Sequence, residues 1–199
     1  MTAENKDEDV IKIVIHGRGG MGVVTACEII AETAFMSGNF KDVHAYPAFG
    51  AERRGAPVQA YAKLSRKEKI WDRAQIEQPD IIIFFDDSLL NQAVLNSLGK
   101  SGIIIINSNK EPKFFAEKYN LSKDIHIIVA DINKLALEKG LTIDGAPIVN
   151  TPILGLLSKS LEELSLDNLN KVIQNKMNDD LAKLNIELIE EGFKLAKTY

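Results

Sequence analysis

Short runs of almost pure isoleucine and phenylalanine constrain the fold most strongly. They cover residues 80–85 and 102–106, and a third apolar run follows at 125–129. Such runs are typical of strands that are buried on both faces of a parallel sheet. Residues 88–98 are long enough for a crossover helix, and another helix is expected at about 131–139. The alternation predicts an α/β fold: a doubly wound, Rossmann-like, mostly parallel sheet with helices on both faces.

The first part of the chain predicts more strands and the first helix. A strand is expected at 12–15 and a helix at 23–36. The sequence Ser37-Gly38-Asn39 should end that helix, because glycine suits a left-handed cap. Two further strands are expected at 43–46 and at 57–64, where apolar and polar residues alternate.

The remaining sequence predicts one domain with two appendages. Residues 1–10 are expected to form a flexible leader, and residues 11–199 a single domain. From about residue 151 to 199 the pattern is helical throughout, and this extension is expected to pack on the sheet. Asp167 is a candidate cap for one helix, and a longer helix should begin near Asn178. Leucines 181, 184, 188 and 195 fall near one face of it, and a partner helix is the alternative occupant of that face.

Composition excludes several classes of function. The net charge is −4, from 24 basic and 28 acidic residues, which argues against a general nucleic-acid binder. The longest apolar run, 81–85, is far shorter than the ~20 residues of a membrane span. The polar, acidic start of the chain predicts no signal or transit peptide. The single cysteine, Cys27, excludes an internal disulfide and a cluster held by four cysteines of this chain, and a cytoplasmic location fits.

A glycine-rich loop is the first candidate site. Gly17-Arg18-Gly19-Gly20-Met21-Gly22 contains G-x-G-x-x-G between an expected strand and an expected helix. Free amides at a helix start favour an anion, so the context suits phosphate binding. A dinucleotide site also needs an acidic residue at the end of the second strand, whereas Asp42 falls before that strand. The alternative is that the glycines only serve close packing.

A loop with adjacent arginines, Arg53 and Arg54, is the second candidate site. Residues 46–57 also hold two prolines, two glycines and two aromatic residues. Arginine can donate two parallel hydrogen bonds to a phosphate or carboxylate. If the first two strands are neighbours, this loop and Arg18 should face the same crevice. The alternative is a surface ion pair between Glu52 and one arginine, which would contribute little.

Other reactive side chains have simpler interpretations. His16 is expected to be a hydrogen-bonded histidine at a strand end, and Cys27 a buried small residue. Asp87 or Ser88 is expected to cap a helix. Trp71 is expected either to pack against other residues of the chain or to lie at an interface with another protein. No residue is predicted to be catalytic, and no histidine spacing predicts a metal site.

Taken together, these segments resemble a known family. Residues 16–25, 49–58, 78–80 and 150–155 are similar, in the family's order, to the gamma subunit of 2-oxoacid:ferredoxin oxidoreductases. The resemblance covers nearly the whole chain. Its most specific part is the segment Glu-Arg-Arg-Gly-Ala-Pro-Val, and this version of the segment looks like that of the pyruvate-type enzymes. Met21 departs from the family, which usually has glutamine there, so the polar contact of that glutamine is in doubt here.

The resemblance implies a role within a complex. Such enzymes, of which pyruvate synthase is one, act in anaerobic metabolism. They use thiamine diphosphate, Mg, iron–sulfur clusters and coenzyme A, held on or with alpha, beta and delta subunits, and pass electrons to ferredoxin. This chain is expected to bind none of these cofactors alone, to be inactive in isolation, and to help position coenzyme A. The alternatives are a gamma subunit for 2-oxoglutarate or a branched-chain 2-oxoacid, or a free-standing NAD(P)-binding oxidoreductase. The residues expected to contact coenzyme A or a partner subunit are Gly17, Arg18, Gly19, Gly20, Met21, Gly22, Arg53 and Arg54.

Overall fold

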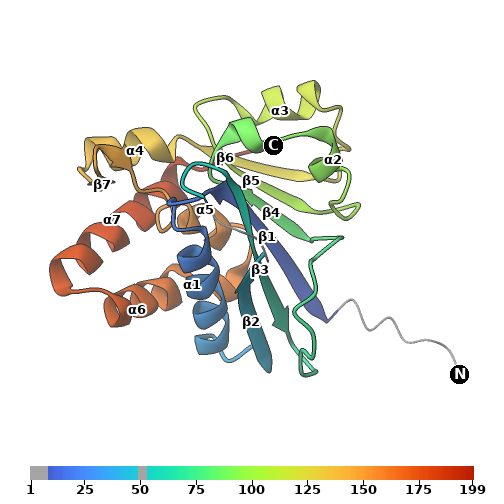
Figure 1. Cartoon of the computed structure of the whole chain (residues 1–199), viewed down its shortest axis with the longest axis horizontal. Helices are drawn as coiled ribbons and strands as arrows, with labels where there is room; N and C mark the ends of the chain where they lie inside the picture. Colours follow the sequence, from blue (N-terminus) through green and yellow to red (C-terminus); the bar gives the residue numbers. More distant parts are fainter. Residues whose placement is uncertain (1–8, 49–52) are drawn as a thin grey trace, which may run out of the picture.

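The computed structural model describes residues 9–48 and 53–199, and one seven-stranded sheet organises them (Figure 1). Most of the expected leader and residues 49–52, including Glu52, lie outside the described residues. The strands, in their order across the sheet, are β2 (Asp42–Pro47), β3 (Pro57–Ser65), β1 (Val10–Arg18), β4 (Ile81–Phe84), β5 (Ile103–Asn107), β6 (His126–Ala130) and β9 (Lys197–Thr198).

The direction of the strands confirms the expected fold class and corrects one detail. The pairs β1–β4, β4–β5 and β5–β6 are parallel, whereas β3 is antiparallel to both β1 and β2, and β9 is antiparallel to β6. Strands β1 and β2 therefore run the same way but are not neighbours, because β3 lies between them. The condition that the first two strands be neighbours is therefore not met.

One face of the sheet is covered by helices throughout. These are α1 (Val23–Met36), α4 (Ile132–Glu138), α5 (Leu154–Ser158), α6 (Leu166–Lys176) and α7 (Asp179–Leu195), with α6 beside α1 and α7 packed on α5 and α6 (Figure 1). Alternate strand residues such as Ile13, Ile83 and Ile105 point into this layer and are fully buried. Period-two alternation places their neighbours on the other face.

The opposite face is covered in two parts. Over β4–β6 lie a short 3₁₀ turn (Asp87–Leu89), α2 (Gln92–Leu95) and α3 (Pro112–Lys118), which bury Phe84 and Ile104. The connection from β4 to β5, which was expected to be one helix, is thus formed by the 3₁₀ turn and the short helix α2. Over β1, β3 and β2 lies an irregular segment, residues 66–80, which we call the strap.

The predicted bounds of helices and strands agree best with the structure where the predicting sequence pattern is longest. Helix α1 has the expected bounds, and Gly38 ends it with a φ of 74°. A two-stranded hairpin of β7 (Thr142–Ile143) and β8 (Ala146–Pro147) was not expected, nor were α3 and β9. The tail is therefore not helical throughout.

The C-terminal helices correct two further expectations. Ser165, not Asp167, caps α6 by accepting from the Asn168 amide. Asn178 does cap α7, but of the four leucines Leu188 is buried and Leu181 and Leu195 are exposed. None of the helices in the described ranges is long and apolar enough to cross a membrane.

Candidate functional site

The glycine loop makes a tight turn from the end of β1 into α1. The amide of Met21 donates to the carbonyl of Arg18 at 3.0 Å, and Gly20 adopts a φ of 92° that L residues rarely adopt. Gly22, with a φ of 73°, precedes the helix, and no side chain caps the first turn of α1. The helix thus begins with backbone donors directed at the loop, an arrangement that favours an anion.

Three glycines of the motif are required by the protein's own packing. A Cβ at Gly17 would collide with the side chain of Val23, and one at Gly22 with the side-chain amide of Asn150. A Cβ at Gly19 would collide with the carbonyl oxygen of Arg53. Close packing therefore accounts for these glycines without a ligand, and the backbone at Gly19 is already covered.

The double-arginine loop lies directly against the glycine loop. The Gly19 amide donates to the Ala56 carbonyl at 2.8 Å, and the Gly55 amide donates to the Gly19 carbonyl at 2.9 Å. The two loops meet because β3 pairs with β1, so that Pro57 starts its strand opposite Arg18. The expected meeting of the loops occurs, but through the antiparallel β3 instead of adjacent first and second strands.

The three arginines of the site have different surroundings. Arg18 Nε contacts Asp86 at 2.6 Å, and its terminal nitrogens donate to the Ser88 hydroxyl at 2.8 Å and the Gly55 carbonyl at 3.2 Å. Arg54 is 84% exposed, with Asp144 on the hairpin at 3.4 Å. Arg53 is exposed, and within residues 9–48 and 53–199 its guanidinium has no ion pair. Arg18 therefore joins the loops to the end of β4, while the other two arginines face solvent.

Asp86 is electrostatically matched to Arg18. Partial burial alone would raise the pKa of its carboxyl, but hydrogen bonds from Arg18 and Ser88 outweigh that effect and lower the pKa. The carboxylate also accepts from the Ser88 amide and caps the 3₁₀ turn. The cap is therefore Asp86, and the expectation that Asp87 or Ser88 would cap this segment is wrong.

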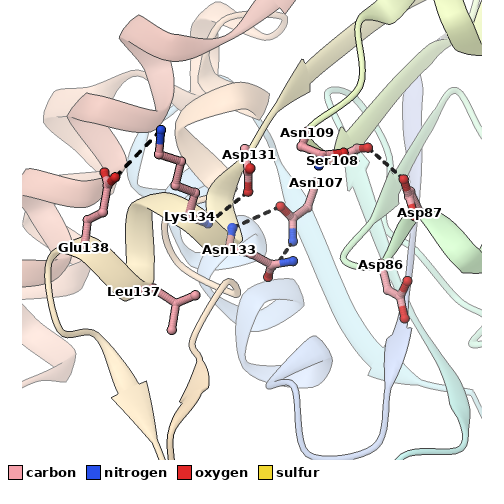
Figure 2. A pocket seen from close by; sticks show the side chains of 10 residues that line it. All are labelled: Asp86, Asp87, Asn107, Ser108, Asn109, Asp131, Asn133, Lys134, Leu137 and Glu138. Atoms are coloured by element: carbon pink, nitrogen blue, oxygen red, sulfur yellow. Dashed lines mark hydrogen bonds and ion pairs between the residues drawn. The ribbon is translucent and has the colours of Figure 1, made fainter.

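A pocket of about 490 Å³ adjoins this edge, at the carboxyl ends of β4, β5 and β6 (Figure 2). Asn107 is buried beneath it, donates to the Phe85 carbonyl at 2.9 Å, and accepts from the Ile132 amide at 2.9 Å. Asp87 accepts from Ser108 and Lys110, both at 2.7 Å. The polar side chains at this edge are therefore largely engaged with one another. The lining residues are Asp86, Asp87, Asn107, Ser108, Asn109, Asp131, Asn133, Lys134, Leu137 and Glu138.

Sequence reasoning missed two residues of the site. Asn150 lies against Gly22 at the start of α1, and its Oδ1 accepts from the Thr151 amide at 3.0 Å. Asp144 reaches Arg54 from the tip of the hairpin. Both come from segments about a hundred residues away from the loops they touch, so no local pattern could have placed them there.

The other reactive side chains occupy structural positions. The Gln59 side-chain amide lies 3.3 Å from His16 Nδ1, and burial lowers the pKa of His16 to about 4. Cys27 is buried, and burial raises the pKa of its thiol to about 12. Trp71 is not packed in this chain, because 87% of it is exposed. No group of potential metal ligands occurs in the part of the chain that the structure describes.

Comparison with known proteins gives consistent matches along the chain. The family model "Pyruvate ferredoxin/flavodoxin oxidoreductase" matches residues 12–195. The pyruvate/ketoisovalerate oxidoreductases common subunit gamma of Thermococcus litoralis is 37% identical over 96% of this chain and 99% of that protein. The pyruvate synthase subunit PorC of Methanosarcina barkeri is 38% identical over 82% of this chain and 84% of that protein. The crystal structure of pyruvate oxidoreductase subunit PORC from Thermotoga maritima superposes with a TM-score of 0.80 at 29% identity, covering 96% of this chain and 98% of that chain.

Proposed function

This chain belongs to the pyruvate ferredoxin/flavodoxin oxidoreductase family, and we propose that it is the gamma subunit of a pyruvate:ferredoxin oxidoreductase complex. Such a complex converts pyruvate and coenzyme A to acetyl-CoA and CO₂ and transfers two electrons to ferredoxin. Matches to gamma and PorC subunits over 82% to 96% of this chain carry this proposal. We assign the thiamine diphosphate, Mg and iron–sulfur clusters to the partner alpha, beta and delta subunits. We place the whole complex in the cytoplasm.

Within that complex, the paired loops are proposed to receive the phosphates of coenzyme A. Arg53 and Arg54 are the exposed cations beside the uncapped start of α1, so side-chain and backbone donors share one edge of the sheet. Arg18 holds the loop through Gly55 instead of facing the ligand. The remaining predicted residues, Gly17 to Gly22, shape the turn. Holding coenzyme A there would lower the entropic cost of bringing its thiol to the acyl intermediate.

Replacing both Arg53 and Arg54 with alanine tests this site. A hydrogen bond to a charged group contributes about 1.5–3 kcal/mol, so the apparent KM for coenzyme A should rise at least about tenfold. The KM for pyruvate should stay near its wild-type value. Lys171→Ala, an exposed cation on α6, serves as the control and should change neither constant.

The competing role of the arginines is contact with a partner subunit. In that case the double variant would lose its partners instead of its affinity for coenzyme A. The subunit ratio of the purified complex separates the two outcomes. An unchanged KM for coenzyme A in an intact complex would contradict the coenzyme A site.

The substrate is tested on the complex that the tagged chain brings down from its own organism without oxygen. Viologen dye reduction with coenzyme A should occur with pyruvate and not with 2-oxoglutarate. A branched-chain 2-oxoacid is tested separately in the same assay, because the Thermococcus relative is named for both pyruvate and ketoisovalerate. Activity with 2-oxoglutarate alone would contradict the assignment to pyruvate.

A free-standing NAD(P)-binding role has less support. The Gly19 amide and carbonyl are bonded to residues 55 and 56, and the Arg53 carbonyl occupies the space that a Cβ would take. A pyrophosphate lying on that glycine would have to displace the double-arginine loop. Tight binding of NADH to the free chain would overturn this argument.

A further inference from the structure

The strap, residues 66–80, covers one end of the sheet without forming a helix or strand. A stretch of this length without regular structure is uncommon in a compact domain and most often carries a function. Its Ile76 joins the small apolar cluster of Val14, Tyr46 and Tyr61 beneath it. Apolar burial is therefore limited, and other contacts must order the strap.

Polar contacts from β2 and β3 supply that order. They fall at alternate strap residues, which is the period of an extended chain lying on a sheet. The strap is thus held from beneath at positions 70, 72 and 74, with the buried Ile76 continuing the series. The contacts are Asp42 Oδ2 to the Ile70 amide at 2.7 Å, Asp72 Oδ1 to Lys63 Nζ at 2.5 Å, and the Tyr46 hydroxyl to the Ala74 carbonyl at 2.8 Å.

The intervening residues form an exposed outer face. Trp71, the single tryptophan of the chain, is 87% exposed, and Lys69 Nζ lies 5.9 Å from the centre of its ring. Lys69 and Arg73 flank it two residues away on either side, and neither forms an ion pair with another described residue. Lys67 differs, because it contacts Asp9 at 2.9 Å. The outer face therefore places one large aromatic side chain between two available cations, while Asp72, whose side chain is 64% exposed, is paired with Lys63 beneath.

We propose that this outer face docks onto an acidic surface of a partner subunit of the same oxidoreductase complex. Trp71 enters an apolar notch, and Lys69 and Arg73 pair with carboxylates around it. Tryptophan and arginine carry much of the binding energy at protein interfaces, and a strap that is already ordered loses little entropy on docking. The inference rests on the proposed function, because it takes its partner from that complex.

A protein surface fits these features better than a nucleic acid. Aromatic and cationic side chains also occur where single strands stack. Nucleic-acid affinity, however, depends on many phosphate contacts, and the strap offers two free cations on a chain of net charge −4.

The test uses the tagged chain expressed in its own organism and purified without oxygen as the assembled complex. Two variants are compared with wild type: Trp71→Ala, and the double charge reversal Lys69→Glu/Arg73→Glu. Each should lower the amount of alpha, beta or delta chain recovered per tagged chain at least about tenfold, with the chains identified by mass spectrometry. Raised salt should weaken the wild-type complex in the same direction.

Matched controls remove an equally exposed group elsewhere. Phe35→Ala removes an aromatic side chain that is 64% exposed on α1, and Lys171→Glu reverses an exposed charge on α6. Both should leave the recovery of subunits unchanged. Because Trp71, Lys69 and Arg73 lie outside the core, the strap variants should keep the far-UV circular dichroism spectrum of wild type.

The outcomes separate this inference from the proposed function. If wild type recovers no oxidoreductase subunit, the proposed function fails. If wild type recovers them and both strap variants do so equally, only the docking surface is overturned. If the preparation instead carries nucleic acid that the charge reversal removes, the proposed occupant is wrong.

Discussion

The two faces of the sheet are covered by different kinds of contact. On the α1 face, five helices bury a continuous apolar layer that runs from Ile13 to Ile189. On the other face, helices cover only β4–β6, and the strap covers β1, β3 and β2 largely through polar contacts. Figure 1 shows this division, with α1, α6 and α7 on one side of the sheet and α2 and α3 on the other.

This difference separates stability from recognition. Apolar burial is non-directional and roughly proportional to the buried area. The α1 face therefore stabilises the fold without requiring specific pairs of contacting residues. Polar anchors hold the strap in one conformation while leaving its outer residues exposed. Substitutions on the α1 face should therefore unfold the chain, whereas those in the strap should mainly affect assembly.

The largest effect is expected at Gly155, where α5 crosses α7. A Cβ there would collide with the Ile189 carbonyl oxygen and lie 2.8 Å from the Phe193 amide nitrogen. Because both neighbours are backbone, the helices must move apart, and Gly155→Ala should lower the free energy of unfolding by about 4 kcal/mol. Urea unfolding measures this loss. Gly99→Ala is the control, since its nearest neighbour would be 3.8 Å away.

The next largest effect is a pH dependence of the free energy of unfolding, and it comes from His16, which points to the strap side of the sheet. Burial lowers its pKa from 6.5 to about 4, and no carboxylate contributes to that shift. Between these values the unfolded chain binds the proton and the folded chain does not, so stability falls as pH drops from 6.5 to 4. The loss should be roughly 3 kcal/mol.

His16→Gln removes the titrating ring and is the matched variant. Its free energy of unfolding, measured at several pH values, should decline less than that of wild type over the same range. Equal slopes for the two proteins would contradict the assignment of the pH dependence to His16.

The central strands and α1 were predictable because their signal is local. The isoleucine runs at 81–83 and 103–106 identify buried strands by themselves, and Gly38 marks the end of α1. The two-residue strands β7 and β9 are too short to show any periodicity. Their positions depend on pairing: β9 forms only because β6 offers it an edge.

The candidate site was predictable in composition but not in geometry. The sequence identified the glycine and arginine loops, and their shared edge was expected. It could not show that β3 would bring the Arg53 carbonyl onto Gly19, nor that Arg18 would bond to Asp86. Both contacts depend on tertiary pairing across distant segments. The part of Arg53 and Arg54 in binding coenzyme A stays a prediction.

The smallest effect on stability is expected at Asp72, the strap residue that pairs with Lys63. The side chain of Lys63 is 10% exposed and that of Asp72 is 64% exposed, so Asp72→Ala leaves a nearly buried ammonium without its partner. The free energy of unfolding should fall by about 1 to 2 kcal/mol, less than at Gly155. Hydrogen bonds from Lys63 and the Ala74 amide lower the pKa of Asp72, so the wild-type contribution persists at neutral pH and is lost in acid.

Lys63→Met combined with Asp72→Ala completes the comparison of the two faces. Removing the charge together with its partner should recover most of the lost stability, because an apolar side chain suits that buried position. Hydrogen exchange should nevertheless show faster exchange of the strap amides in both variants, with no change in α7. Equal protection of the strap in wild type and variants would show that apolar burial at Ile76, and not the polar anchors, orders this segment.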